Sequence, residues 1–448
     1  MSVFTKKFYT LVFMAMFSLS VQSQNNAPAF KDNLSDSLLV SIKMSFDNAT
    51  VTVSPQKCGS KFDRKLLITL TQPLDHFGES KDNFEQRIFI FHKSTTKPVV
   101  FVTEGYDAAY AESPSYNHEL CDMLDANLIV VEHRFFGQSK PENYDWQYLT
   151  VKQASADHHN VAKALKNVYT NKWISTGTSK GGTTALYHKA LYPSDVDIVV
   201  PYVAPMTIAQ EDPRPIDWIL NQAADAKVRK QISDYQEFVL KNKSAAIQFL
   251  KAHQEKTNCV FKMDLETVVE YTVFEYAFSF WQWGISPSRI PTKKQGVEGA
   301  VNHLFMLVSP STFYVDSNTS SAIYYYQAYH ETGYYCFNEM AKRFKKLSRN
   351  DYSNRIMAPQ NMNIDYNPKT HQEIIQILNE KGHHIIQIHG EIDPWRYAAW
   401  EPNDKLDSYF LIAKGAPHSA NYKSLNSEQK ALFDKAIFDW IGISVKRK

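Results

Sequence analysis

The sequence predicts an α/β fold in which a mostly parallel sheet carries a long helical insertion. Residues 98–102 and 128–131 are short, apolar throughout and rich in β-branched side chains, as strands covered on both faces are. Residues 154–168 then place apolar side chains at helical spacing before the next strand-like run, which is the alternation of an α/β sheet. From about residue 206 to 381 helical periodicity replaces the strand pattern, and strands return from residue 384.

The remaining elements follow from the same periodicities. Residues 66–70 and 87–91 alternate apolar and polar side chains and predict an antiparallel pair at one edge of the sheet. The other expected elements are strands at residues 172–176, 196–200, 384–388 and 409–412, a tight turn at 177–182, and helices at 183–191, 217–249, 271–283 and 427–441. Ser427 is the predicted N-cap of the last helix.

The first residues have the pattern of a secretory signal. Lys6 and Lys7 precede an apolar run over residues 8–21, and Val21 and Ser23 occupy the positions that a signal peptidase inspects. The run is shorter than the roughly 20 apolar residues of a membrane anchor, so we expect cleavage near Ser23 and a periplasmic or extracellular protein. The resulting division is a signal peptide (1–23), a catalytic core in two parts (24–205 and 382–448) and a helical cap between them (206–381).

Charge and composition argue against several kinds of partner. The formal net charge is +2, and removal of the two lysines of the signal brings it to about zero, so no strong field attracts nucleic acid or a membrane surface. The histidine pairs at 158–159 and 383–384 are adjacent and point in different directions, so we expect no metal site and no cofactor. Two disulfides with open pairing, or buried thiols, are expected for the four cysteines Cys58, Cys121, Cys259 and Cys336.

One short motif predicts the chemistry. The sequence Gly-Thr-Ser-Lys-Gly at residues 177–181 fits the G-x-S-x-G pattern of a nucleophile elbow, in which glycines leave room for a strained turn that exposes Ser179. The helix that follows directs its amino end at the site, so the backbone amide of Lys180 is a candidate oxyanion donor. Between a predicted strand and a predicted helix, this motif indicates an α/β-hydrolase.

A nucleophilic serine needs a base, and the base needs an acid that orients it, in the chain order Ser, Asp, His on this fold. Asp393 follows the strand at 384–388, and His418 lies in a Gly/Pro loop after the next strand, so these are the predicted acid and base. Glu391 is a rival acid in the same loop. His389 is interpreted as structural.

The loop after the strand at 98–102 supplies the second oxyanion donor on this fold, which makes the backbone amide of Tyr106 the candidate. Glu104 in the same loop puts negative charge beside a site that must stabilise negative charge. It either meets a cation such as a substrate amino terminus, or it forms a salt bridge with Arg134 or another structural base.

Three segments together resemble the secreted bacterial prolyl tripeptidyl and tetrapeptidyl aminopeptidases, and more distantly the lysosomal Pro-X carboxypeptidase and dipeptidyl peptidase II group. They are residues 132–139, 176–182 and 391–395. The likeness covers the chain from about residue 66 to residue 418. It implies an α/β-hydrolase with Ser179, Asp393 and His418 as its triad, and a helical insertion that restricts access to chain ends.

The resemblance also implies substrate contacts in the insertion. Residues 329–334 resemble a Glu-x-Gly-aromatic segment of the related group, so Glu331 joins Glu104 as a candidate anchor for the substrate ammonium group. A proline preference needs a flat apolar slot, for which Trp281 and Trp283 are the candidates, together with Phe278 and Phe280. The same aromatic spacing is also typical of an ordinary helical core.

Two other functions share many of these features. An esterase or lipase has the same fold, triad and order, but leaves the two acids near Ser179 unexplained. An inactive, hydrolase-like binding protein commonly loses the serine or the histidine, and both are present here. We therefore predict a secreted serine exopeptidase that acts on peptide substrates and releases proline-containing tri- or tetrapeptides from their amino termini through an acyl-enzyme.

Overall fold

One mixed sheet organises the molecule. The structure is a computed structural model, and it describes residues 37–46, 50–78, 80–142, 145–315 and 320–446; the expected signal segment lies outside these residues. Within the described residues the sheet has nine strands in the order β1-β2-β3-β5-β4-β6-β7-β8-β9. In chain order the strands are β1 (Val51–Gln56), β2 (Arg64–Pro73), β3 (Asn83–His92), β4 (Val99–Thr103), β5 (Asn127–Val131), β6 (Trp173–Thr178), β7 (Ile198–Tyr202), β8 (Ile386–Gly390) and β9 (Tyr409–Ala413).

Strand direction divides the sheet into two parts. β1, β2 and β3 pair antiparallel with one another, and β3 pairs antiparallel with β5, as the alternating pattern at 66–70 and 87–91 predicts. From β5 to β9 the pairs are parallel, and this part contains the predicted buried strands. The predicted α/β-hydrolase fold, a mostly parallel sheet with a helical insertion, is confirmed.

Helices cover both faces of the parallel part. Along β4, Val99 and Phe101 face one apolar cluster, which contains side chains of α3 (Val151–Leu165) and α4 (Lys180–Leu191). Val100 faces the opposite cluster, with side chains of α2 (Glu119–Leu124) and α13 (Ser427–Ile441). Because both faces are covered, these strands are apolar at every position. Among the described residues, no helix is long and apolar enough to cross a membrane.

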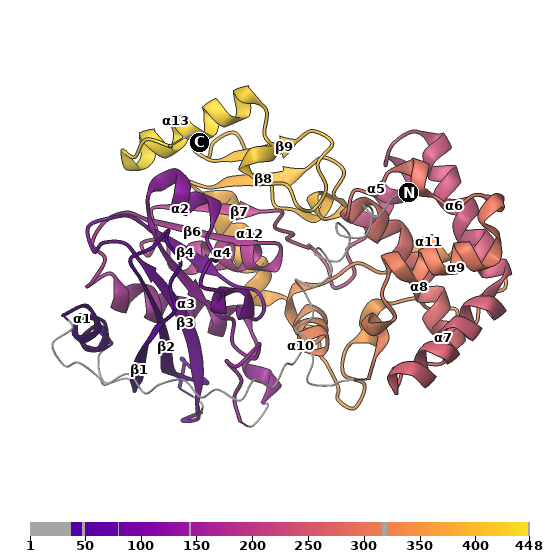
Figure 1. Cartoon of the computed structure of the whole chain (residues 1–448), viewed down its shortest axis with the longest axis horizontal. Coiled ribbons are helices and arrows are strands. Elements are labelled where there is room, and N and C mark those ends of the chain that lie inside the picture. The colour runs from indigo at the N-terminus through magenta and orange to yellow at the C-terminus, as the bar shows by residue number, and fades with distance from the viewer. Residues whose placement is uncertain (1–36, 47–49, 79, 143–144, 316–319, 447–448) are drawn as a thin grey trace, which may run out of the picture.

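The insertion between β7 and β8 forms a second lobe, and Figure 1 shows its helices α6 to α9 gathered to one side of the sheet. Its helices are α5 (Arg214–Asn221), α6 (Ala226–Lys241), α7 (Lys243–Thr257), α8 (Leu265–Gln282), α9 (Gly296–Leu307), α10 (Ser320–Gln327) and α11 (Asn338–Ala341). α8 contacts α6, α7 and α9 and is buried on most sides. The predicted aromatic helix is therefore the central helix of this cap lobe.

Three details differ from the sequence-based expectations or resolve them. α12 (Lys369–Lys381) falls inside the predicted cap, yet its Ile374 and Leu378 belong to the same cluster as α3 and α4, so it covers the sheet. The N-cap of α13 is Asn426, not Ser427, because Asn426 and Gln429 form a reciprocal capping box. All four cysteines are free thiols.

Candidate active site

Ser179 lies at a sharp turn between β6 and α4. Its backbone has φ 56° and ψ −123°, a region that costs free energy for any residue with a side chain. The turn is tight because glycines cross closely: a Cβ added to Gly177 would lie 2.3 Å from the carbonyl carbon of Gly181. The Ser179 amide donates to the Tyr202 carbonyl at 2.8 Å, which ties the turn to β7. The predicted strand, turn and helix are therefore present.

The structure brings the three predicted residues together. The Nε2 of His418 is 2.9 Å from the Oγ of Ser179, and its Nδ1 is 2.7 Å from the Oδ2 of Asp393. Asp393 is fully buried, His418 is nearly so, and Ser179 is half-buried. An ionised carboxylate only accepts hydrogen bonds, so Nδ1 donates to Asp393 and Nε2 is left to accept the serine proton. A nucleophile and its base need this arrangement.

Two loops hold the acid and the base. Asp393 follows β8, and its Oδ1 accepts the backbone amide of Trp395 at 3.1 Å. His418 follows β9, and its backbone amide donates to the carbonyl of Gln282 at 3.0 Å, at the end of α8. The cap therefore touches the histidine loop directly. The rival acid Glu391 instead accepts the amide of Gly415, at 2.7 Å.

Two backbone amides lie at or beside this turn. Lys180 is the first residue of α4, so its amide has no acceptor within the helix. The amide of Tyr106 donates to no group in the part of the chain that the structure describes. The loop and the turn can approach this closely because residue 105 is a glycine. A Cβ added there would lie 2.7 Å from the Gly181 nitrogen. These amides can donate hydrogen bonds to the oxyanion that forms when Ser179 attacks a carbonyl carbon.

The geometry agrees with comparisons with known proteins. The family described as PS-10 peptidase S37 matches residues 43–448. The chain belongs to the S37 peptidases. The match confirms the predicted enzyme class, a serine peptidase.

Among similar proteins, the prolyl tri/tetrapeptidyl aminopeptidase of Streptomyces mobaraensis is 27% identical over 395 residues, which are 85% of this chain and 81% of that protein. The lysosomal Pro-X carboxypeptidase of Homo sapiens is 28% identical over 144 residues, or 28% of this chain and 29% of that protein. The solved proline iminopeptidase of Mycobacterium smegmatis covers 84% of this chain and 97% of its own, with 13% identity and a TM-score of 0.35. The resemblance drawn from the motifs is confirmed.

In this S37 peptidase, the Lys180 side chain fixes the loop that carries the Tyr106 amide. Its Nζ donates to the carbonyl oxygen of Gly105 at 2.5 Å. That oxygen and the Tyr106 N–H belong to one planar peptide and point in opposite directions. Burial lowers the pKa of Lys180 to about 7, partly offset by the nearby Glu104. The lysine therefore orients the amide that is the candidate second oxyanion donor.

We expect Lys180→Met to lower kcat about 10- to 100-fold with little change in KM. A freed Gly105 peptide would turn its partner amide away from the oxyanion, and loss of one such donor costs about 100- to 1,000-fold. Lys189→Met is the matched control, because Lys189 also donates to backbone carbonyls, at the other end of α4. A normal kcat for the first variant, or an equal loss in both variants, would contradict this role.

The Glu104 carboxylate does not pair with Arg134. It accepts a hydrogen bond from the Tyr110 hydroxyl and is half-buried. Burial raises its pKa to about 7, and the neighbouring Asp107 adds to that effect. Arg134 is fully buried and binds Asp157 instead, with Nε 2.7 Å from Oδ2. The predicted salt bridge between Glu104 and Arg134 is therefore wrong, since Arg134 is used to connect the sheet to α3.

Glu331 lies on the cap side of the same region. The residue is 3% exposed, and its carboxylate accepts the amide of Val151, the first residue of α3, at 2.8 Å. This contact gives Glu331 a structural role, and its predicted role as an ammonium anchor stays a prediction.

We expect the stability of the protein to fall as pH rises from about 4.5 to 8, in part because of Glu331. Burial raises the pKa of this carboxyl from 4.5 to about 8, so the folded chain keeps a proton that the unfolded chain releases within this window. Glu331→Gln keeps an acceptor for Val151 and should remove up to a few kcal/mol of that dependence. Urea unfolding at pH 5 and pH 8, with the exposed Glu380→Gln as control, measures it; identical pH profiles for all three proteins would refute it.

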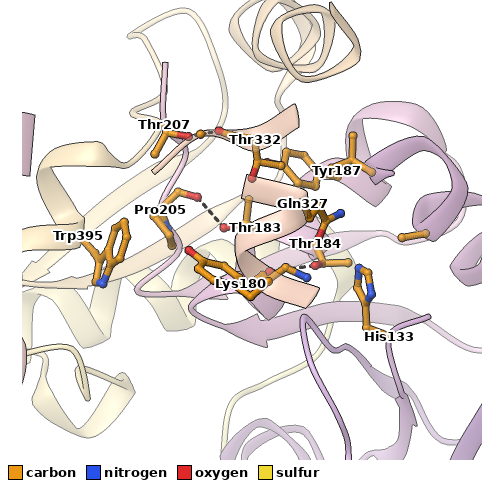
Figure 2. Close-up of a pocket in the computed structure, with 14 residues that line it drawn as sticks. His133, Lys180, Thr183, Thr184, Tyr187, Pro205, Thr207, Gln327, Thr332 and Trp395 are labelled. Carbon is orange, nitrogen blue, oxygen red and sulfur yellow. Dashed lines mark hydrogen bonds between the residues drawn. The ribbon is translucent and has the colours of Figure 1, made fainter. Parts of the chain in front are cut away.

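A small cavity of about 40 Å³ lies beside the nucleophile, between α4 and the cap (Figure 2). Lys180, Thr183 and Tyr187 line it from α4, and Tyr324 and Trp395 line it from the cap side and the Asp393 loop. The predicted slot residues Trp281 and Trp283 are not among the residues that line this cavity. They lie at the end of α8, where Trp281 is buried against Trp218, with ring centroids 5.9 Å apart, and Trp283 is half-buried.

Trp395 lines the cavity but was not predicted to do so. It belongs to the segment that located Asp393, and its ring packs on Phe278 of α8 at 5.1 Å and on Tyr335 at 5.3 Å. The only available signal was its position two residues after the predicted acid. Tyr324 and Tyr335 were also not predicted from the sequence. They come from a cap segment whose contacts with the site depend on tertiary packing.

Proposed function

We propose that this protein is a serine exopeptidase that releases proline-containing tri- or tetrapeptides from the amino termini of peptides, with Ser179, His418 and Asp393 as its triad. The hydrogen-bonded chain from Ser179 through His418 to Asp393, in a chain of the S37 family, is the observation that carries this proposal. The name of the Streptomyces mobaraensis relative supports the fragment length and the proline preference.

The reaction proceeds by two acyl transfers. The Oγ of Ser179 attacks the scissile carbonyl while the Nε2 of His418 takes the serine proton, and the amides of Lys180 and Tyr106 bind the oxyanion. The tetrahedral intermediate collapses when His418 gives its proton to the leaving amine, which departs with the carboxyl-terminal part of the substrate. Water, deprotonated by His418, then attacks the acyl-enzyme and releases the short amino-terminal peptide.

The restriction to chain ends comes from the cap. The contact between the Gln282 carbonyl and the His418 amide puts α8 directly over the base, and the cavity beside Lys180 is walled by residues of the cap. On this proposal the cap excludes folded protein chains and admits the end of a peptide. Trp395 and Tyr324 offer flat apolar faces in that cavity for a proline ring.

Export is the second part of the proposal. Residues 1–23 combine two lysines, an apolar run and a cleavage-site pattern, and a periplasmic or extracellular peptidase would act on peptides outside the cytoplasm. Amino-terminal sequencing of the protein from the exported fraction of its host should begin at or near residue 24. An intact amino terminus in the cytoplasmic fraction would refute export.

The activity is tested with a proline-containing tripeptidyl chromogenic amide, supplied with a free and with an acetylated amino terminus, and with a short-chain ester. Selective cleavage of the free amide by the wild-type protein, absent in Ser179→Ala, is the expected result. Turnover of the ester without cleavage of either amide would replace the proposal with an esterase.

A further inference from the structure

Glu275 is a carboxylate without a counter-ion in the middle of the cap. It lies on α8, is half-buried, and accepts hydrogen bonds from the hydroxyls of Tyr335 and Ser279, each at 2.7 Å. No lysine, arginine or histidine of the described residues pairs with it. Burial raises its pKa to about 7, because its surroundings disfavour the ionised form. A bound cation would offset the free-energy cost of ionising this carboxyl.

The carboxylate faces an aromatic wall that continues to the active site. Tyr334 stacks on Tyr335, with ring centroids 4.3 Å apart, and lies 5.4 Å from Trp395, beside the predicted acid. Tyr334 also contacts Tyr324 at 5.6 Å, and Tyr324 contacts Tyr106 at 5.7 Å. The wall thus runs from the oxyanion loop to the tyrosines around the carboxylate.

The position of Glu275 along α8 sets its distance from the His418 loop. The carbonyl of Gln282 holds the amide of His418, and Glu275 is seven residues, or two turns, earlier on the same side of the helix. At 1.5 Å of rise per residue this places it about 10 Å from the histidine loop. An extended peptide advances about 3.3 Å per residue, so three residues cover the same distance.

We propose that Glu275 binds the ammonium group of the substrate's amino terminus and thereby sets the released fragment at about three residues. This inference rests on the function proposed above and names the residue that measures length. A charge-assisted hydrogen bond between carboxylate and ammonium is strong where water is largely excluded. The two hydroxyls hold the carboxylate in place before the substrate arrives.

The other two acids are less suitable for this task. The carboxylate of Glu331 is buried and already accepts the amide of Val151. The Cα of Glu104 lies 3.7 Å from the position of a Cβ on Gly181, two residues after the nucleophile. An amino terminus bound there would leave too little room for three residues before the scissile bond.

The test uses a ladder of chromogenic amides with one to five residues before the leaving group and proline beside it, together with the acetylated tripeptide. We expect the wild-type protein to prefer the free three-residue substrate over its acetylated form about 100-fold. In Glu275→Gln, kcat/KM for the free substrate should fall about 10- to 100-fold, since a bond to a charged group is lost. Hydrolysis of the acetylated substrate should change less than twofold, and the length preference should flatten.

Controls separate this role from folding and from the proposed function. Glu266→Gln changes an acid on the same helix that pairs with Lys243, and should keep the wild-type preference. Labelling of Ser179 by a fluorophosphonate should proceed at the wild-type rate in Glu275→Gln, which shows an intact nucleophile. Wild-type discrimination in Glu275→Gln, or loss of discrimination in Glu104→Gln or Glu331→Gln alone, would overturn the inference while leaving the peptidase activity established. Absence of any amide cleavage by the wild-type protein would overturn both.

Discussion

Ser179→Ala is expected to lower kcat for peptide amides about 10⁶-fold, the largest effect of any substitution considered. The hydroxyl is the atom that His418 Nε2 holds at 2.9 Å, and no other nucleophile replaces it in the acyl transfer. A small residual rate over water should remain, because the oxyanion amides and the substrate site are untouched. Initial rates with a tripeptidyl amide, corrected by active-site titration of the wild-type protein, measure the ratio.

The fold should be unaffected by this change. Alanine meets the same backbone strain at φ 56° as serine does, so the melting temperature should stay within a few degrees. Ser419→Ala alters the exposed serine next to His418 and is expected to retain full activity. Equal activity of Ser179→Ala and the wild-type protein would remove Ser179 from the mechanism and return the search to other nucleophiles.

The sheet was predictable where burial alone dictates the residue type. β4 and β5 are buried at every position, so their apolar runs identified them without ambiguity. β1 was missed because only one of its six residues, Val53, is buried, and an exposed edge strand shows no clear alternation. The signal for a strand is thus strongest in the interior of the sheet, next to the nucleophile.

The cap was predictable as helical but not in its divisions. The region 217–249 was expected as helix, and the structure breaks it between α5 and α6 and again between α6 and α7. Asp225 marks the first break, because its side chain accepts the amide of Val228 at 2.9 Å as an N-cap. This signal was present in the sequence but is weaker than the continuous helical periodicity around it.

The site residues, too, were predictable on the sheet and not in the cap. Ser179, Asp393 and His418 were located because each follows a strand of the sheet, where the fold puts chemistry regardless of the cap. Glu275 was not located, because its partner Tyr335 is 60 residues away on another cap segment. Only the packing of the two segments gives that carboxylate the surroundings on which its proposed role depends.

Asp393→Asn is expected to lower kcat about 10⁴-fold at neutral pH, the second largest effect. Oδ1 of Asp393 accepts the Trp395 amide, so the carbonyl oxygen of an asparagine must stay on that side to keep the bond. The asparagine NH₂ group then faces Nδ1 of His418, where the carboxylate oxygen was 2.7 Å away. The imidazole must present a lone pair at Nδ1 and carry its proton on Nε2, so it cannot accept the proton of Ser179.

Control of the His418 tautomer distinguishes Asp393 from Glu391, the rival acid in the same loop. The carboxylate of Glu391 lies 2.7 Å from the Gly415 amide and contacts neither His418 nor Ser179. The kcat of Glu391→Gln should therefore stay within about threefold of wild type. The loss in Asp393→Asn should also shrink at high pH, where an imidazole without its acid can be bypassed by hydroxide. A loss of about 10⁴-fold in Glu391→Gln, with near-normal activity in Asp393→Asn, would exchange the roles of the two acids and would require the His418 loop to move, because its Nδ1 points at Asp393.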